Sequence, residues 1–445
     1  MESNPKSLSS TIALLFGDAL RSVTVLGVTV LGVTALRITA LGITALSLVF
    51  PSSTVAEAPV QVGLENFVAQ PDSPWKGKRL GLVAHSASVG RDGRHAIDLL
   101  RKKGFKLVRV FSPEHGLRGQ AAAGQAVPSG RDPATGLPVV SLYGVHKRPQ
   151  PADLEGLDAL LFDLQGAGVR FYTYVSTLIY CLEAAAEANL ELVVLDRPNP
   201  LGGNRIEGPV SAPRDMEPAS FVNLAPGPLV HGLTLGEMAK LVNSTLPTKA
   251  RLTVVPMKGW QRSMIWKDTG LLWVPPSPNL TTANTALVYP GTALLEATNV
   301  SEGRGTDYPF QLLGAPWLER SAIHPSKFRL TAAGFNLQGA SFQPEPSPAA
   351  LEPKHAGKPC LGLRVIVVNG TTAEPYRLGL RLVQWFSKHT GFAWLREGQA
   401  LTRLLGTPKV YDALAKGTSI GEILAADEAD HMAWRKQRKA FLLYE

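Results

Sequence analysis

From residue 78 onward, short apolar runs alternate with segments in which apolar residues recur three and four positions apart. Such apolar runs predict buried strands, and the three-and-four spacing predicts helices. The predicted strands lie at 78–86, 105–112, 137–144, 158–165, 191–200, 250–257 and 360–370. The predicted helices lie at 96–104, 175–190, 233–246, 377–389 and 419–444. Near-continuous apolar strands that alternate with helices are typical of a parallel α/β sheet with both faces covered.

The pattern changes at residue 271, where the chain becomes rich in proline, asparagine and other turn residues. A further strand and two helical regions follow this stretch. We therefore expect a first α/β domain at 59–288 and a second, smaller α/β domain at 289–445.

The N-terminal segment, residues 1–58, follows a different pattern. Residues 23–47 are five pentads, VTVLG, VTVLG, VTALR, ITALG and ITALS, which form an apolar stretch interrupted by Arg37. Small residues at Thr54 and Ala56 are typical of a cleavage site. We expect an export leader, either a cleaved signal peptide or an uncleaved anchor, although a misplaced start codon or a buried helix also fits. The protein is then expected in the periplasm or outside the cell, with contact to a membrane only through this segment.

Composition narrows the classes of function. The chain has 445 residues, of which 45% are apolar and 18% are charged, as in a globular protein. Its formal net charge is +9, but the basic residues are scattered and form no dense stripe of the kind that binds nucleic acid. The two cysteines, Cys181 and Cys360, belong to no Cys/His cluster with zinc spacing, so we expect no structural metal. Both a disulfide and two free thiols fit their positions.

Polar side chains gather where the predicted strands end. In open α/β sheets, ligands bind outside the carboxyl ends of the strands. Here those ends carry AHS, SPEHG, LYG, DLQGAGVRFYTY and DRPNP. The candidate residues that they supply are Glu114, His115, Tyr143, Asp163, Gln165, Arg170, Tyr172, Asp196, Arg197 and Asn199. The later stretches PPSPN and NVSEGRGTDYPF add Asn279, Glu302 and Arg304. This concentration of acids, arginines and tyrosines favours a binding or catalytic site.

Each candidate also has a purely structural interpretation. Ser112, Pro113 and Glu114 have the composition of a helix N-terminus. Asp163 and Asp196 fit helix caps or turn positions, the arginines fit ion pairs with these acids, and the tyrosines fit core packing.

Familiar catalytic motifs are missing from the sequence. The glycines of GAG at 166–168 suggest a dinucleotide site, but Phe171 stands where the third glycine of G-x-G-x-x-G is required. The sequence contains no G-x-S-x-G, no P-loop and no H-E-x-x-H. Mechanisms of serine hydrolases, P-loop enzymes and zinc proteases therefore have no local support, and we expect no cofactor.

Several stretches, taken in order, resemble one family. They are FSPEHGLRG, TGLPVVSLYG, FDLQGAGVRFYTYVSTL, VLDRPNPLGG, HGLTLGEMA, PPSPNL and YPGTALLEATNVSEGRGTDYPFQLLGAPW. Through them the sequence closely resembles the exo-β-N-acetylmuramidase (NamZ) family, glycoside hydrolase family 171. The resemblance implies a Rossmann-like N-terminal domain, a smaller C-terminal domain and an active-site cleft between them. It also implies release of N-acetylmuramic acid from the non-reducing ends of peptidoglycan fragments, without a metal or a nucleotide.

The resemblance implies roles for individual residues. The SPEHG glutamate, the leading catalytic candidate of the family, corresponds to Glu114, and its histidine corresponds to His115. The family's RFYTY, DRPNP and SEGRGT residues correspond to Arg170, Tyr172, Asp196, Arg197, Asn199, Glu302 and Arg304. Apart from Glu302, we assign these residues to substrate binding, and from their positions in the sequence we add Asp163, Gln165, His231 and Asn279. Two positions depart from the family pattern: the first strand ends in AHSAS, with His85 and Ser86, and Gly166 stands where an acid is common. Because of the altered AHSAS turn, a non-catalytic protein that binds cell-wall saccharides on the same fold is the alternative.

Cleavage of a glycosidic bond needs an acid that protonates the leaving oxygen. Glu114 suits this role if Phe111 and Pro113 desolvate the carboxyl group and so raise its pKa. A positive charge on His115 or Arg118 would oppose that shift.

A second carboxylate usually supplies the nucleophile or activates water. We favour Glu302 for this role, with Asp163 and Asp196 as further candidates; the acetamido group of the substrate is an alternative nucleophile. Muramic acid also carries a lactyl carboxylate, which a guanidinium binds through paired hydrogen bonds. The candidates for that contact are Arg170, Arg197 and Arg304.

Overall fold

The computed structural model describes residues 60–445, apart from 214–215, 217–219 and 325–331. The predicted leader, residues 1–58, lies outside this part of the chain. Within the described ranges, no helix combines the length and the apolar character that are needed to cross a membrane.

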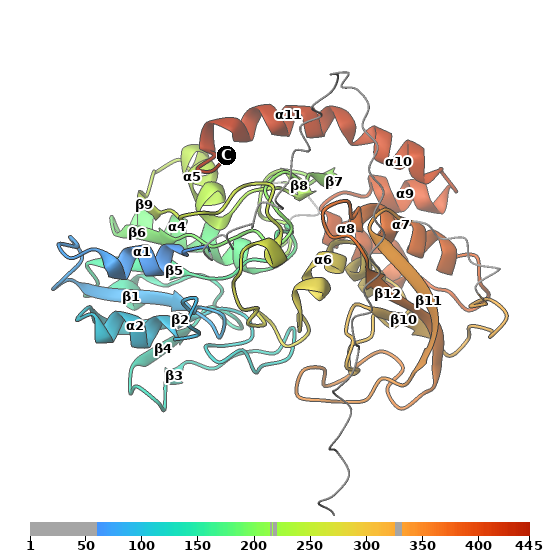
Figure 1. The fold of residues 1–445 in the computed structure, drawn as a ribbon, viewed down its shortest axis with the longest axis horizontal. Helices are drawn as coiled ribbons and strands as arrows, with labels where there is room; N and C mark the ends of the chain where they lie inside the picture. Colours follow the sequence, from blue (N-terminus) through green and yellow to red (C-terminus); the bar gives the residue numbers. More distant parts are fainter. Residues whose placement is uncertain (1–59, 214–215, 217–219, 325–331) are drawn as a thin grey trace, which may run out of the picture. The chain divides into compact units, whose positions relative to one another are not determined.

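A seven-stranded sheet forms the N-terminal part of the described chain (Figure 1). Its strands are β1 (Arg79–Ala84), β2 (Lys106–Ser112), β3 (Gly130–Arg131), β4 (Pro138–Ser141), β5 (Ala159–Asp163), β6 (Glu191–Leu195) and β9 (Arg251–Val255). They lie in the order β3-β4-β2-β1-β5-β6-β9, and every neighbouring pair is parallel except β3 with β4. The prediction of a parallel α/β sheet is confirmed. Because the strand order reverses between β1 and β5, this point is the topological switch of the sheet.

Helices cover both faces of this sheet. The helices are α1 (Gly63–Ala69), α2 (Ala96–Lys102), α3 (Pro151–Leu154), α4 (Tyr174–Glu187) and α5 (Leu235–Thr245). Apolar residues of α1 and α2 pack against Leu80 and Leu82 of β1 in one core cluster. Apolar residues of α4 and α5 pack on the other face, in a larger cluster that also contains Val83 of β1. The alternation of side chains along a strand explains why neighbouring β1 residues belong to different clusters.

Smaller sheets and several helices follow. Strands β7 (Glu207–Val210) and β8 (Pro228–Val230) pair with each other, and β10 (Leu312–Ala315), β11 (Phe335–Phe342) and β12 (Cys360–Val367) form an antiparallel sheet in the order β10-β12-β11. The helices are α6 (Ala283–Thr292), α7 (Pro375–Phe386), α8 (Gln399–Leu405), α9 (Lys409–Ala415), α10 (Ile420–Ala426) and α11 (Glu428–Arg438). Short 3-10 segments are η1 (Trp266–Asp268), η2 (Ala293–Ala297), η3 (Leu395–Gly398) and η4 (Lys439–Phe441). The smaller α/β part that the sequence predicts is therefore present.

The prediction missed the short elements α1, α3, α6, α8, α9, β3, β7, β8 and β10, and two further details differ from it. The predicted helical region at 419–444 consists of α10, α11 and η4, because the chain turns at Asp427, which ends α10 and precedes α11. Strand β11 has no continuous apolar run, since buried and exposed residues alternate in its FNLQGASF sequence, and the sequence analysis missed it. The predicted domain boundary between residues 288 and 289 falls within α6; this boundary stays a prediction.

Candidate active site

The segment after β2 contains no helix start. Strand β2 ends at Ser112, and turns follow it, with φ angles of 71° at His115 and 76° at Gly116. The next helix, α3, begins only at Pro151. The helix N-terminus interpretation of Glu114 is therefore wrong. The tight turn instead holds Glu114 at the carboxyl end of a central strand, where ligands bind in sheets of this type.

Three residues from distant segments fix Glu114. The N–H of Gly124 donates to its Oε1 at 2.9 Å, and the Thr173 hydroxyl donates to its Oε2 at 2.7 Å. The Tyr174 hydroxyl lies 3.2 Å from the backbone oxygen of Glu114. Because the side chain is 8% exposed and bonded through both oxygens, the carboxyl group has one defined orientation.

His115 is oriented by a separate contact. Its Nδ1 lies 2.8 Å from the carbonyl oxygen of Ala121, so this nitrogen carries the proton and donates it. Burial lowers the pKa of His115, although the neighbouring Glu114 charge opposes that shift. The ring is therefore predominantly neutral at pH 7.

A cavity of about 310 Å³ opens beside Glu114. Its buried lining residues are Glu114, His115, Phe171, Tyr172, Thr173, Ser277, Asn279, Leu280, Tyr289 and Phe310. Its more exposed lining residues, which form the rim, are Ala123, Gly124, Tyr143, Val222, Glu296, Arg304 and Leu404. The residues come both from loops of the large sheet and from the C-terminal part of the chain, as expected for a cleft between the two α/β parts. The volume is in the range of small-molecule sites.

Arg304 and Glu296 form the wall contributed by the C-terminal part. Arg304 Nη2 lies 2.6 Å from Glu296 Oε1, and Arg304 Nε lies 3.3 Å from Glu302 Oε1. The guanidinium also stacks 4.9 Å from the ring centroid of Phe310. A cation at the rim, held by two acids and an aromatic ring, is suited to bind an anionic group of a ligand.

Glu302 lies behind this wall and does not line the cavity. Its Oε2 is 3.0 Å from Lys354 Nζ, and the residue is 4% exposed. Burial alone would raise the pKa of Glu302, but the charges of Lys354 and Arg304 outweigh burial and lower it. The structure therefore assigns Glu302 to a buried ion-pair cluster that positions Arg304, rather than to the second catalytic carboxylate.

Glu296 is the cavity carboxylate that the sequence analysis missed, together with the neutral cavity residues Thr173 and Tyr289. It lies in η2, within the LLEATNVSEGRG stretch that the family resemblance had already singled out, but only Glu302 of that stretch was chosen. Among the residues that line the described cavity, Glu114 and Glu296 are the two carboxylates. Burial raises the pKa of Tyr289 well above its usual value, and the charges of Glu296 and Glu114 both add to this shift. Tyr289 thus lies within electrostatic range of both acids.

Aromatic rings and one amide also line the cavity. Burial and the charge of Glu114 raise the pKa of the Tyr143 phenol. Tyr172 packs edge-on against Tyr174 at 4.7 Å, and Tyr289 packs edge-on against Phe310 at the same centroid distance of 4.7 Å. Asn279 Nδ2 donates to the backbone oxygen of Ala349 at 2.9 Å, which leaves its side-chain oxygen as an acceptor.

Six of the candidate residues line the cavity, namely Glu114, His115, Tyr143, Tyr172, Asn279 and Arg304, whereas the others lie elsewhere. Asp163 and Arg197 form a buried ion pair, with Arg197 Nε 2.6 Å and Nη2 2.8 Å from the two carboxylate oxygens. The Gln165 amide donates to the backbone oxygen of Pro198 at 2.9 Å. These three side chains fill the switch point of the sheet, where the adjoining cavities measure only about 20 Å³.

Arg170 is fully buried and does not reach the cavity. Its Nη2 donates to the backbone oxygens of Pro209 at 3.1 Å and Leu405 at 2.8 Å. Burial lowers its pKa to about 9. Arg170 therefore tethers β7 to α8, and its expected contact with a substrate carboxylate is not possible in this arrangement.

The AHSAS turn, one of the two departures from the family pattern, also lies outside the cavity. His85 is fully buried, and its Nε2 accepts the N–H of Gln165 at 2.9 Å. Ser86 donates to the backbone oxygen of Pro275 at 3.2 Å. No residue of the turn lines the cavity, although the His85 ring packs edge-on at 4.9 Å against Tyr174, which contacts the Glu114 backbone. The change of sequence therefore leaves the cavity lining intact and gives no support to a non-catalytic protein.

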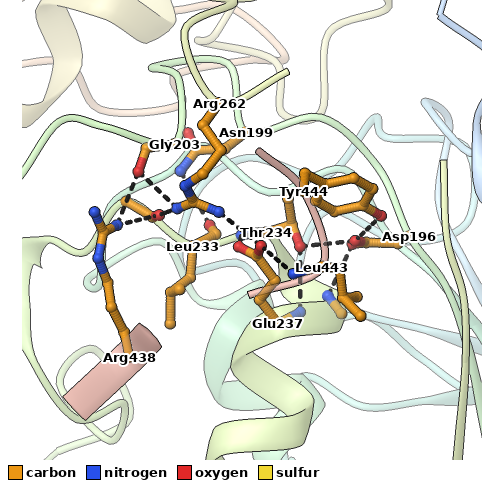
Figure 2. Close-up of polar contacts among 12 residues, drawn as sticks. Asp196, Asn199, Gly203, Leu233, Thr234, Glu237, Arg262, Arg438, Leu443 and Tyr444 are labelled. Atoms are coloured by element: carbon orange, nitrogen blue, oxygen red, sulfur yellow. Dashed lines mark hydrogen bonds and ion pairs between the residues drawn. The ribbon is translucent and has the colours of Figure 1, made fainter. Parts of the chain in front are cut away.

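Asp196, Asn199 and His231 belong to a second polar region, shown in part in Figure 2. Asp196 accepts hydrogen bonds from the Tyr444 hydroxyl at 2.6 Å and from the Thr234 hydroxyl at 2.7 Å. Asn199 donates to the backbone oxygen of Leu233, and His231 Nδ1 accepts the N–H of that same residue. These side chains bond to the backbone and to neighbouring hydroxyl groups, and none of them lines the cavity beside Glu114, so they hold the fold together.

No group of three His, Cys, Asp or Glu in the described part of the chain is arranged to hold a metal ion. The cysteines are Cys181 in α4 and Cys360 in β12, and both are buried free thiols. Burial raises the pKa of Cys360 to about 11, so its thiol is protonated at pH 7.

Comparison with known proteins identifies the family. Residues 80–284 match the N-terminal domain of exo-beta-N-acetylmuramidase NamZ, and residues 287–444 match its C-terminal domain. The chain is 40% identical over 396 residues to the peptidoglycan beta-N-acetylmuramidase NamZ of Bacillus subtilis (strain 168). This match covers 88% of this chain and 93% of that protein.

Two crystal structures of DUF1343 family proteins from Bacteroides fragilis NCTC 9343 have the same fold. They superpose with TM-scores of 0.76 and 0.67, each at 30% identity, and each match covers 87% of this chain and 99% of the other. The resemblance seen in the sequence motifs is confirmed, and the chain belongs to the exo-beta-N-acetylmuramidase NamZ family.

Proposed function

We propose that this protein is an exo-acting β-N-acetylmuramidase that releases N-acetylmuramic acid from the non-reducing ends of peptidoglycan fragments. The observation that carries the proposal is the anchored Glu114 beside a sugar-sized cavity, in a chain that is 40% identical to a peptidoglycan beta-N-acetylmuramidase. A cavity of about 310 Å³ with a mostly buried lining suits a single sugar.

Glu114 is the proposed general acid. Its Oε1 accepts the Gly124 N–H, which can only donate, so the transferable proton belongs on Oε2. The Thr173 hydroxyl beside Oε2 can either donate or accept, and it therefore accommodates both protonation states. In the reaction, the proton moves from Oε2 to the glycosidic oxygen as the bond to the anomeric carbon breaks.

Glu296 replaces Glu302 as the proposed second carboxylate. It lines the cavity with Glu114, and its ion pair with Arg304 holds it in place at 2.6 Å. A carboxylate in this position either attacks the anomeric carbon or activates a water molecule.

Arg304 is the proposed partner of the lactyl carboxylate. Its Nη2 and Nε bind Glu296 and Glu302, and neither pair uses Nη1. Arg170 and Arg197 are committed to buried contacts away from the cavity. The arginine at the rim is thus the candidate that a muramic substrate can reach.

The proposal is tested by product analysis on short glycans. We expect N-acetylmuramic acid to be released from fragments that end in muramic acid, and no sugar from matched fragments that end in N-acetylglucosamine. Release from internal positions, or equal release from both kinds of terminus, would contradict it. In the same assay, Glu296→Gln should lower kcat on the muramic substrate, and Arg304→Lys should reduce the preference for muramic over glucosamine termini about tenfold.

We also propose that residues 1–58 direct export, because peptidoglycan lies outside the cytoplasmic membrane. The apolar pentads at 23–47 support this assignment. Cell fractionation tests it: the full-length chain should be recovered in the periplasm, the membrane or the medium, and recovery of a 60–445 variant from those fractions would refute the assignment.

A further inference from the structure

The rim of the cavity is asymmetric around the proposed acid. Gly124 and Tyr143 lie beside Glu114, since the Gly124 N–H donates to Glu114 Oε1 and the charge of Glu114 acts on the Tyr143 phenol, whereas Glu296 and Arg304 pair with each other in the wall from the C-terminal part. A general acid must reach the oxygen that joins the terminal sugar to the next one. With the terminal sugar in the cavity, the next sugar therefore leaves across the Glu114 side of the rim.

An aromatic platform adjoins this side of the rim, formed by the half-buried rings of Tyr143, Tyr180 and Phe221. The rings of Tyr180 and Phe221 are stacked with centroids 5.7 Å apart, and those of Tyr143 and Phe221 are 6.2 Å apart. Tyr180 thus supports Phe221 from one face, while Tyr143 connects the platform to the cavity.

Lys147 adds a positive charge to the platform. Its Nζ lies 4.9 Å from the ring centroid of Phe221 and 5.8 Å from that of Tyr143. An ammonium group offers three hydrogen-bond donors. The platform therefore combines apolar ring faces with donors for hydroxyl or amide oxygens, which is the composition of sites that bind small polar ligands.

We propose that the aromatic platform is the binding site for the sugar that follows the scissile bond, which is N-acetylglucosamine in peptidoglycan. The C–H face of this sugar packs on Phe221 and Tyr143, and Lys147 donates to its oxygen atoms. The assignment rests on the proposed function, because it takes the direction of the leaving group from the role of Glu114. The platform assignment adds that the enzyme recognises two consecutive sugars by different chemistry. Arg304 pairs with the carboxylate of the terminal sugar in the cavity, and ring faces outside the cavity contact the next sugar.

The test uses Phe221→Leu, which keeps an apolar side chain and removes the ring. Phe392→Leu is the matched control, because Phe392 is also half-buried beside another ring, Trp394 at 5.4 Å, but does not line the cavity. Binding of methyl N-acetylglucosaminide and of N-acetylmuramic acid is measured by calorimetric titration, and kcat/KM is measured on the muramyl-glucosamine disaccharide.

We expect Phe221→Leu to weaken binding of the glucosaminide about five- to tenfold and to lower kcat/KM by a similar factor. Binding of N-acetylmuramic acid should change less than about twofold. Phe221→Tyr should restore binding, since it restores the ring. If Phe221→Leu lowers the thermal midpoint strongly, Lys147→Ala provides the same comparison, with an expected loss of about threefold for the glucosaminide.

Unchanged glucosaminide binding in both Phe221→Leu and Lys147→Ala would overturn the proposal. So would an equal loss of binding for both sugars, since the platform would then only shape the cavity. Failure of the proposed function looks different: the wild-type protein would cleave no muramic glycoside, while the titrations would still report whether the platform binds the glucosaminide.

Discussion

Two polar regions lie at the carboxyl ends of strands in the large sheet, and they differ in how fully their acids are satisfied. In the first region, Glu114 accepts hydrogen bonds from the Gly124 N–H and the Thr173 hydroxyl, lies beside the Tyr143 phenol and faces a cavity. In the second, Asp196 accepts two on each oxygen: Oδ1 from the N–H groups of Arg197 and Gly236, and Oδ2 from the hydroxyls of Thr234 and Tyr444. A carboxylate has about four acceptor positions, so Asp196 has none left for a ligand.

Glu237 extends the second region in the same way (Figure 2). Its Oε1 lies 2.6 Å from Arg262 Nη1 and accepts the Leu443 N–H at 2.9 Å, while its Oε2 accepts the Thr234 N–H at 3.0 Å. The contact between Glu237 Oε2 and the Thr234 N–H closes the capping box at the start of α5. Glu237 thus uses three of about four acceptor positions and does not line the cavity beside Glu114. Acids bonded in this way hold elements together, whereas an acid that faces a cavity is available for chemistry.

The largest expected effect separates the two regions by activity. Glu114→Gln preserves an acceptor for the Gly124 N–H but removes the transferable proton, so hydrolysis should fall about 10²- to 10⁴-fold. The thermal midpoint should stay close to that of the wild type. Release of N-acetylmuramic acid and a thermal melt measure the two quantities on the same sample. The exposed Glu155→Gln serves as control and should affect neither.

Retention of more than about a tenth of the wild-type activity by Glu114→Gln would exclude Glu114 as the acid, because a general acid contributes at least about a hundredfold. A large loss of activity with an equally large fall in the midpoint would instead place Glu114 in the same structural class as Asp196.

The sheet and the position of Glu114 were predictable for a physical reason. Both depend on local patterns: apolar runs define buried strands, and the residues directly after a parallel strand lie at the ligand-binding edge. The same rule applied equally to Asp196 and could not separate it from Glu114. The partners that satisfy Asp196 include Tyr444, which is 248 positions away in the sequence. Such a contact exists only after the C-terminal segment has packed against the sheet.

The cavity wall from the C-terminal part shows the same limit. The stretch with Glu296 and Glu302 was recognised as a unit, but local sequence does not tell which glutamate faces the ligand. The position of Lys354 decides it, since this residue binds Glu302 at 3.0 Å from a different segment and holds it behind Arg304. Long-range packing, rather than residue type, selects the member of the pair that remains at the cavity.

A smaller effect is expected on stability in the second region. Glu237→Ala leaves the buried Arg262 guanidinium without its carboxylate, and breaking a buried ion pair in this way costs about 3–5 kcal/mol of unfolding free energy. Denaturant unfolding measures the loss. At denaturant concentrations well below its unfolding midpoint, the variant is folded and should keep the kcat of the wild type. The control is Arg79→Ala, which breaks an exposed pair with Asp158 and should cost much less, because solvent screens that pair. A loss for Glu237→Ala no larger than that of the control would contradict the structural role.

The smallest effect is a difference in pH dependence. Burial raises the pKa of Asp196 from 3.8 to about 6, although the hydrogen bonds from Tyr444, Thr234 and Gly236 oppose that shift. The folded protein therefore holds a proton that the unfolded chain releases as the pH rises above about 4. The stability that Asp196 contributes is fully present below that pH and is lost as the pH rises through about 6.

Asp196→Asn removes this titration, so its unfolding free energy should fall less steeply than that of the wild type between pH 4 and pH 6, by about 1–3 kcal/mol over the interval. Unfolding curves at closely spaced pH values give the difference in unfolding free energy between the two proteins. The contributions of the other titrating groups cancel in this difference. Parallel pH profiles would show that Asp196 is ionised in the folded protein throughout this range. The effect of the four hydrogen bonds on the pKa of Asp196 would then outweigh the effect of burial. Asp196 would resemble Glu302, whose pKa is lowered, more than a neutral, buried acid.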